Sequence, residues 1–199
     1  MTTTEQTIKE GSHSPWGTVQ EVYPVIPGMI FVSTAGHGGI KLSRQFNAKM
    51  PAYLRKPGGW YEEDCEWSLV FAVFEKEILS TPGIDSCHIG VIQKEQHKGT
   101  FRSYYPDQYE RFYGVTLKPG ESYSRDRQIF EKEHANDFVV VSAVSTKNGF
   151  VRCTATRGGK RESGAEKRTY LVQSEEYDTR GKFSFVIDED RHSRLSDVS

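Results

Sequence analysis

An Asn-Gly pair at positions 148 and 149 dictates how the C-terminal half of this chain can fold. It separates two runs rich in β-branched and aromatic residues, residues 138–145 and 150–156. An Asn-Gly pair between two such runs indicates an antiparallel hairpin, because the central residues of a type I′ turn need positive φ angles. Residues 167–174 and 182–187 have a similar strand-like composition. The C-terminal half is therefore predicted to be a four-stranded antiparallel β-meander.

The N-terminal half combines a short hairpin with helical segments. Residues 18–25 and 29–34 have strand-like compositions, and Pro27-Gly28 between them supplies a turn. A long helix is predicted over residues 62–79, because acidic residues crowd its start and Thr81-Pro82-Gly83 follows its end. Further short elements are expected at residues 40–42 (a return strand), 43–50, 106–113 and 124–133 (helices), and 84–96 (a strand or a weak helix). These patterns predict an α+β fold, with an N-terminal β-hairpin and helices packed with the C-terminal meander.

The chain has 199 residues, of which 36% are hydrophobic, and this is enough for one domain with a full core. We expect a single α+β domain over residues 15–190, with two lobes, 15–100 and 101–190, as the alternative arrangement. The polar segment 1–14 is expected to be a disordered tail, and residues 191–199 are expected to fray.

Charge and hydrophobicity exclude several classes of protein. The 26 basic and 27 acidic residues give a net charge of -1, whereas nucleic-acid-binding domains are typically basic, so a nucleic-acid partner is not expected. No apolar run approaches the roughly 18 residues that span a bilayer. The N-terminus lacks the pattern of a signal peptide. The three cysteines form no Cys-x-x-Cys pair, which argues against structural zinc, and the protein is expected to be cytoplasmic without membrane association.

A histidine among three glycines, followed downstream by a run of acids, is the strongest candidate for a functional site. His37 lies among Gly36, Gly38 and Gly39, and glycines allow a ligand to approach the backbone closely. Imidazole and carboxylate side chains serve as general acids and bases, and carboxylates also bind divalent cations. The candidate catalytic residues are His37, Glu62, Glu63, Asp64 and Cys65, and the candidate binding residues beside them are Gly36, Gly38, Gly39, Trp60 and Tyr61.

Structural roles for the same residues remain open alternatives. The Gly-His-Gly-Gly run also fits a hairpin tip with positive φ angles, and acids at a helix start stabilise the helix dipole. Cys65 lies in the first turn of the predicted helix on its apolar stripe, and its acidic neighbours raise a thiol pKa, so a core cysteine is favoured over a nucleophile. A metal site would need a third ligand, for which His88 is the nearest histidine. We therefore predict no metal and no cofactor.

A second group of charged residues lies in and beside the loop between the second and third runs of the C-terminal half. Arg157, Lys160 and Arg161, with Lys167 and Arg168 nearby, form either a solvated loop or a weak nucleic-acid contact. No phosphate-binding glycine loop, metalloprotease helix or nucleophile-elbow motif occurs in the chain.

Two signatures, residues 33–43 (STAGHGGIKLS) and 58–67 (GGWYEEDCEW), resemble those of an uncharacterised domain family of bacteriophage, plasmid and other mobile-element proteins. The resemblance extends more loosely over residues 16–190. It implies a protein that acts in a bacterial host cell on host or defence machinery, and it assigns no catalytic residue.

Together these observations favour a non-enzymatic protein that binds a host or defence-system protein, for example as an inhibitor of a defence nuclease. The alternative is a small hydrolase or transferase that uses His37 with Glu62, Glu63 or Asp64, and Cys65 as a further candidate. Nucleic-acid binding through residues 157–168 is a weaker alternative.

Overall fold

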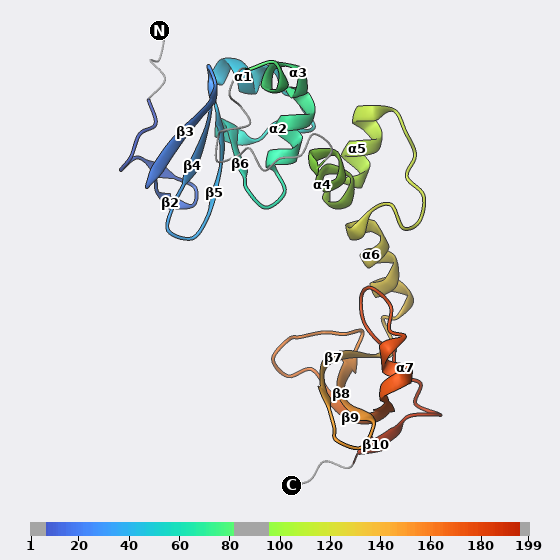
Figure 1. Cartoon of the computed structure of the whole chain (residues 1–199). Helices are drawn as coiled ribbons and strands as arrows, with labels where there is room; N and C mark the ends of the chain where they lie inside the picture. The colour runs from blue at the N-terminus through green and yellow to red at the C-terminus, as the bar shows by residue number, and fades with distance from the viewer. Residues whose placement is uncertain (1–6, 82–95, 196–199) are drawn as a thin grey trace. The chain divides into compact units, whose positions relative to one another are not determined.

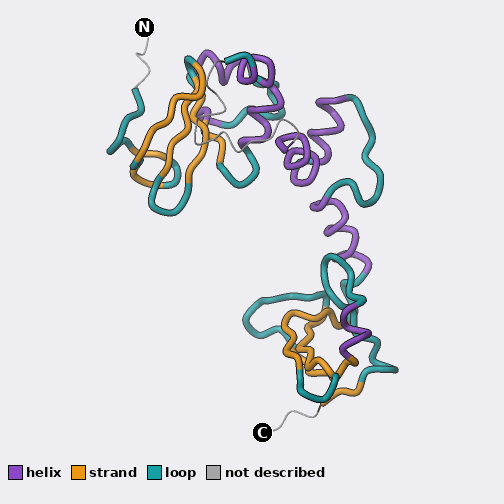
Figure 2. Tube along the Cα trace, in the orientation of Figure 1, coloured by secondary structure: helices purple, strands orange, loops and turns teal. Residues whose placement is uncertain are grey.

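The computed structural model describes residues 7–81 and 96–195 of the chain (Figure 1). The chain forms two compact units, Met1–Ser124 and Arg125–Ser199, each with its own sheet and helices (Figure 2). The α+β class is confirmed. The division after Ser124 differs from the lobe boundary near residue 100 that the sequence suggested.

The N-terminal unit is built on a four-stranded antiparallel sheet. Its strands β3 (Glu21–Ile26), β4 (Met29–Ser33), β5 (Gly38–Leu42) and β6 (Trp60–Glu62) lie in that order. Gly28, with a φ of 89°, makes the turn between β3 and β4, which confirms the predicted hairpin. Strands β1 (His13–Ser14) and β2 (Gly17–Thr18) form a separate short antiparallel pair. The segment 1–14, which was expected to be a disordered tail, therefore contributes one strand.

The predicted long helix over residues 62–79 is wrong at its start and is broken in the middle. Glu62 is the last residue of β6, and helix α2 (Trp67–Val73) begins only after a turn. Phe74 (φ -111°, ψ 24°) then separates α2 from α3 (Glu75–Leu79). The acids did not start a helix because residues 60–62 pair with β5, and tertiary pairing overrides local propensity.

Two further helical regions complete this unit. Helix α1 (Arg44–Lys49) begins after Ser43, whose side chain accepts a hydrogen bond from the Phe46 N–H, and a short 3-10 turn, η1, covers Pro57–Gly59. Helices α4 (Gln96–Tyr104) and α5 (Pro106–Tyr113) surround the fully buried Phe101 with aromatic side chains. The predicted helix at residues 106–113 is confirmed, whereas the ambiguous segment at residues 84–95 lies outside the described residues.

The C-terminal unit contains a second four-stranded antiparallel sheet, as predicted. Helix α6 (Tyr123–Glu133) leads into strands β7 (Phe138–Ser145), β8 (Phe150–Arg157), β9 (Lys167–Gln173) and β10 (Ser193–Leu195), and helix α7 (Ser174–Asp178) follows β9. The sheet order is β10-β9-β8-β7. Gly149, with a φ of 73°, makes the predicted turn between β7 and β8, but Asn148 has no positive φ, so the turn is not the type I′ turn that the sequence suggested. The core of this unit includes Tyr170, Cys153 and Val172.

The fourth strand of this sheet is not the one that the sequence predicted. Residues 182–187 do not pair with β9 but run beside the opposite edge, where Val140 N–H donates to the Phe185 carbonyl (2.9 Å) and Ile187 N–H donates to the Phe138 carbonyl (2.8 Å). This position buries Phe185 and Ile187 against the sheet. β10 takes the place beside β9, within the terminal segment that was expected to fray.

Candidate functional site

His37 is held at the end of a tight connection between β4 and β5. Both the Thr34 N–H (2.8 Å) and the Thr34 hydroxyl (2.7 Å) donate to the His37 carbonyl, which fixes the backbone on the N-terminal side of β5. The His37 side chain is 59% exposed. Its backbone is therefore fixed while its imidazole is free to turn toward neighbouring groups.

Glu62 and Glu63 reach this imidazole through the pairing of β6 with β5. Glu62 lies opposite Gly39, and the Glu63 N–H donates to the Gly38 carbonyl at 3.1 Å. The His37 Nδ1 and Glu62 Oε1 atoms are 4.0 Å apart. One side-chain ligand atom from each of His37, Glu62 and Glu63 lies within 4.8 Å of the other two. The structure thus brings together three of the five candidate catalytic residues.

Gly38 and Gly39 serve close packing rather than a special backbone conformation. Neither these two glycines nor Gly36 has a positive φ angle, so the expectation of a positive-φ hairpin tip is wrong. A Cβ on Gly39 would lie 2.3 Å from the Tyr61 carbonyl oxygen and 2.4 Å from the Trp16 ring, and one on Gly38 would lie 2.5 Å from Glu63 Oε2. Absence of these two side chains lets the Glu63 carboxylate and the Trp16 ring approach β5 closely.

Glu62 is in an environment that disfavours its own negative charge. Its Oε2 accepts a hydrogen bond from the Asp64 N–H (2.8 Å), whereas its Oε1 is buried and has no hydrogen-bond partner in the described structure. Burial, reinforced by the nearby Asp64 and Glu63 carboxylates, raises the pKa of Glu62. A buried, unpaired carboxylate oxygen is costly unless a cation or a proton satisfies it.

The surrounding acids are only partly neutralised. Glu66 pairs with Lys56, with 2.5 Å between Lys56 Nζ and Glu66 Oε1. Over the described residues, no lysine or arginine pairs with Glu62, Glu63 or Asp64. The cluster therefore carries an excess of negative charge directly beside the imidazole.

The side chains of Asp64 and Cys65 do not join the cluster of His37, Glu62 and Glu63. Asp64 is exposed, and its backbone N–H, rather than its carboxylate, contacts Glu62. Cys65 Sγ lies 3.2 Å from the Tyr105 hydroxyl, which comes from the start of α5. Burial is the main cause that raises the pKa of the Cys65 thiol, which makes it a poor nucleophile at neutral pH.

The two aromatic candidates at residues 60 and 61 lie on opposite faces of β6. Tyr61 is fully buried, and its hydroxyl donates to Asn47 Oδ1 (2.8 Å) and accepts from the Lys56 N–H (3.1 Å). Trp60 packs edge-on against Trp16, with ring centroids 5.6 Å apart. The sequence did not identify Trp16 and Tyr105 as neighbours of the site.

The part of the chain that holds this cluster matches a known domain family. Residues 9–135 match the model of a family described as a domain of unknown function, DUF7007. The chain belongs to this family. No curated protein and no solved structure matches it. The DUF7007 match includes His37, Glu62 and Glu63, and it ends before the C-terminal sheet.

The basic loop lies outside the DUF7007 match, and part of its charge is already engaged. The Arg157 guanidinium donates to the Asn136 carbonyl (2.6 Å), and the Arg168 guanidinium bonds Glu166 and Glu189. Both arginines also stack on the Phe138 ring. Arg161 lines a surface pocket instead. These contacts leave fewer free cations for a nucleic acid than the sequence suggested.

None of the helices in the described part of the chain is long and apolar enough to cross a membrane.

Proposed function

We propose that the DUF7007 domain binds a divalent transition-metal ion through His37, Glu62 and Glu63 and uses it for hydrolysis. The observation that carries this proposal is the convergence of the three ligand atoms around a buried carboxylate oxygen that has no other partner. A bound cation would satisfy Glu62 Oε1 and offset the local excess of negative charge.

The donor set fits zinc or manganese better than magnesium. One imidazole nitrogen and two carboxylates are common ligands for these ions, whereas magnesium prefers oxygen ligands alone. Nitrogen and oxygen ligands about 2.1 Å from a tetrahedral metal lie about 3.4 Å apart. The present separations of up to 4.8 Å would have to contract by up to about 1.4 Å, to which rotation of the exposed imidazole can contribute.

Three protein ligands would leave a coordination position for water, as in catalytic zinc sites. A metal-bound water supplies hydroxide near neutral pH, which is the nucleophile that hydrolysis requires. The Trp16–Trp60 pair lies beside the cluster and offers an apolar wall for a substrate. This proposal takes up the hydrolase alternative, in which His37 and the carboxylates act together and Cys65 takes no part.

Metal titration tests the binding step directly. Manganese binding followed by electron paramagnetic resonance, and zinc binding by calorimetry, should show one site per chain. His37→Ala and Glu62→Gln should each weaken affinity about tenfold or more. His13→Ala and Glu77→Gln change an exposed histidine and an exposed glutamate outside the cluster, so they should leave affinity unchanged. Equal metal affinity in all four variants would contradict a metal site at His37, Glu62 and Glu63.

Hydrolysis requires a separate measurement. The zinc- and manganese-loaded protein is assayed on ester and phosphodiester model substrates, with His37→Ala as the inactive reference. Metal binding without any hydrolysis that depends on His37 would retain the metal site but reject the enzymatic function.

A second proposal concerns the C-terminal unit, which lies beyond the DUF7007 match. We propose that it binds a host or defence-system protein in a bacterial cytoplasm, in keeping with the mobile-element setting that the signatures suggest, with inhibition of a defence nuclease as one form. Support comes from Val144 (53% exposed) and Phe150 (37% exposed), two large apolar side chains on one hairpin.

Affinity capture from bacterial lysate tests this second proposal. The full chain and a Val144→Ser/Phe150→Ser variant are compared side by side. A partner captured by the first and lost by the second is expected. Identical capture profiles would contradict a partner-binding role for this hairpin.

A further inference from the structure

The outer edge of β7 is covered along less than half of its length. Residues 184–187 lie beside Phe138–Val140, and the Ser184 hydroxyl donates to the Val140 carbonyl at 2.6 Å. Beyond this point, no described residue accepts from or donates to the outward-facing backbone groups of residues 141–145. An unpaired strand edge of this kind is a template for an added strand.

The pairing of β7 with β8 changes register where the cover ends. Val140 pairs with Ala155 and Ser142 pairs with Thr154, so Val141 is an extra residue in a β-bulge. Bulges recur beside binding sites because they redirect side chains and bend the strand. Residues 142–145 are exposed.

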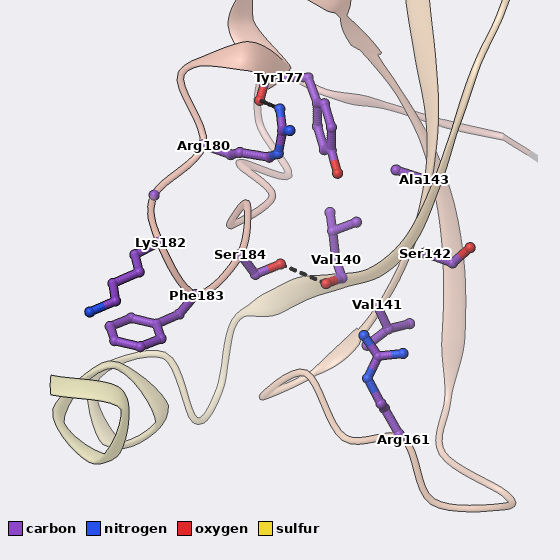
Figure 3. A pocket seen from close by; sticks show the side chains of 11 residues that line it. Val140, Val141, Ser142, Ala143, Arg161, Tyr177, Arg180, Lys182, Phe183 and Ser184 are labelled. Carbon is purple, nitrogen blue, oxygen red and sulfur yellow. Dashed lines mark hydrogen bonds between the residues drawn. The ribbon is translucent and has the colours of Figure 1, made fainter. Parts of the chain in front are cut away.

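A pocket of about 340 Å³ opens beside this uncovered edge (Figure 3). Val141 and Ala143 line it on the strand side, and Tyr177 and Phe183 line it on the other. In Figure 3 the Tyr177 side chain points toward Val140 with its hydroxyl leading. Val140, a buried core residue of this unit, also lines the pocket, so the pocket adjoins the core and offers apolar contacts to a side chain.

The polar lining of the pocket carries one sign of charge. Arg161, Arg180 and Lys182 contribute to it, and no acidic residue is among the residues that line it. Arg180 pairs with the exposed Asp178 (3.2 Å), whereas Arg161 is exposed and forms no ion pair within the described chain. Complementary charge favours an acidic ligand and disfavours a basic one.

We propose that residues 141–145 of β7 bind an extended acidic peptide as an additional strand, with one apolar side chain of the peptide in the pocket. Backbone hydrogen bonds would supply affinity, and the arginines and lysine would select acidic side chains. This inference rests on the second proposed function, because it names the chemistry of the partner segment that the C-terminal unit would bind. It is independent of the metal site.

Nuclear magnetic resonance of the full ¹⁵N-labelled chain tests this proposal. The probe is a synthetic eight-residue peptide that alternates glutamate with valine and has one central phenylalanine. Amide signals of residues 141–145 should shift with saturable binding. Methylation of alternate peptide nitrogens, which removes the backbone donors on one edge, should weaken binding at least about fivefold. A peptide with lysine in place of glutamate should bind no more tightly than the methylated peptide.

Charge variants provide a matched pair. Arg161→Glu should weaken binding at least about fivefold, whereas Arg194→Glu, an exposed position on β10 at the opposite edge of the sheet, should leave it unchanged. The proposal is overturned if the peptide causes no shifts at residues 141–145, or if the methylated peptide binds equally well. It is also overturned if inorganic phosphate alone reproduces the shifts. Because this probe needs no lysate partner, its failure is distinguishable from a failure to capture a host protein.

Discussion

Replacement of Gly39 by alanine should destabilise the N-terminal unit strongly, and the structure sets the magnitude. The added Cβ would lie 2.3 Å from the Tyr61 carbonyl oxygen and 2.4 Å from the Trp16 ring. The carbonyl belongs to the β5–β6 pair, so it cannot move away without disturbing the strand pairing that places Glu62. Overpacking of this kind costs about 3 kcal/mol, toward the upper end of measured values.

Urea unfolding followed by tryptophan fluorescence measures this effect in one unit alone. All three tryptophans, at positions 16, 60 and 67, belong to the N-terminal unit. With a slope of about 2 kcal/mol per molar urea, a loss of about 3 kcal/mol lowers the midpoint by about 1.5 M. Gly36→Ala is the matched control, because its Cβ would meet nothing within 4 Å and its φ is not positive.

The control should change the unfolding free energy by no more than about 0.5 kcal/mol. Equal midpoints for Gly39→Ala and Gly36→Ala would refute the close approach of Trp16 and β6 to β5. The geometry of the proposed metal site would then lose its basis as well, since the same pairing positions both carboxylates.

Three further predictions concern individual titratable groups. In the metal-free protein, Glu62→Gln should raise the unfolding free energy at pH 7 and have little effect near pH 4, in the same fluorescence assay. The reason is that a raised folded-state pKa makes stability fall as pH rises above the ordinary glutamate pKa. Glu189→Gln should lower the unfolding free energy of the C-terminal unit at pH 7, because a Tyr170 hydrogen bond and Arg168 lower the pKa of Glu189. This destabilisation should vanish as pH falls below that lowered pKa. Amide signals of β8, followed in urea, measure the effect. Cys65 should react with iodoacetamide at pH 8 more slowly than an unstructured thiol, as peptide mapping by mass spectrometry will show; equal rates would contradict its raised pKa.

Local sequence signals predicted the elements that are fixed by turns and caps. Pro27-Gly28 and Asn148-Gly149 placed both hairpins correctly, because the required φ angles are properties of a few adjacent residues. Ser43 likewise identified the start of α1. These features depend on interactions within a few positions of the chain, which a single sequence contains.

The errors arose where distant segments compete for the same strand edge. Residues 182–187 have the composition of a strand, but composition does not say which edge of the sheet they will join. The acids at positions 62–64 resemble a helix start, and only pairing with β5 turns Glu62 into the end of a strand. For the site, the sequence supplied the right residue types, whereas their convergence depends on sheet order.

The register of β6 connects the buried core to the proposed metal site. Side chains alternate between the two faces of a strand, so a slip of one residue would exchange the faces of Tyr61 and Glu62. Tyr61 opposes such a slip, because its buried hydroxyl bonds both Asn47 and the Lys56 backbone on the core side. Glu62 is thereby held on the opposite face, paired with Gly39 of β5. The buried tyrosine in the Gly-Gly-Trp-Tyr-Glu-Glu run thus acts as a positioning residue, and the glutamates after it are the groups that would meet a metal ion.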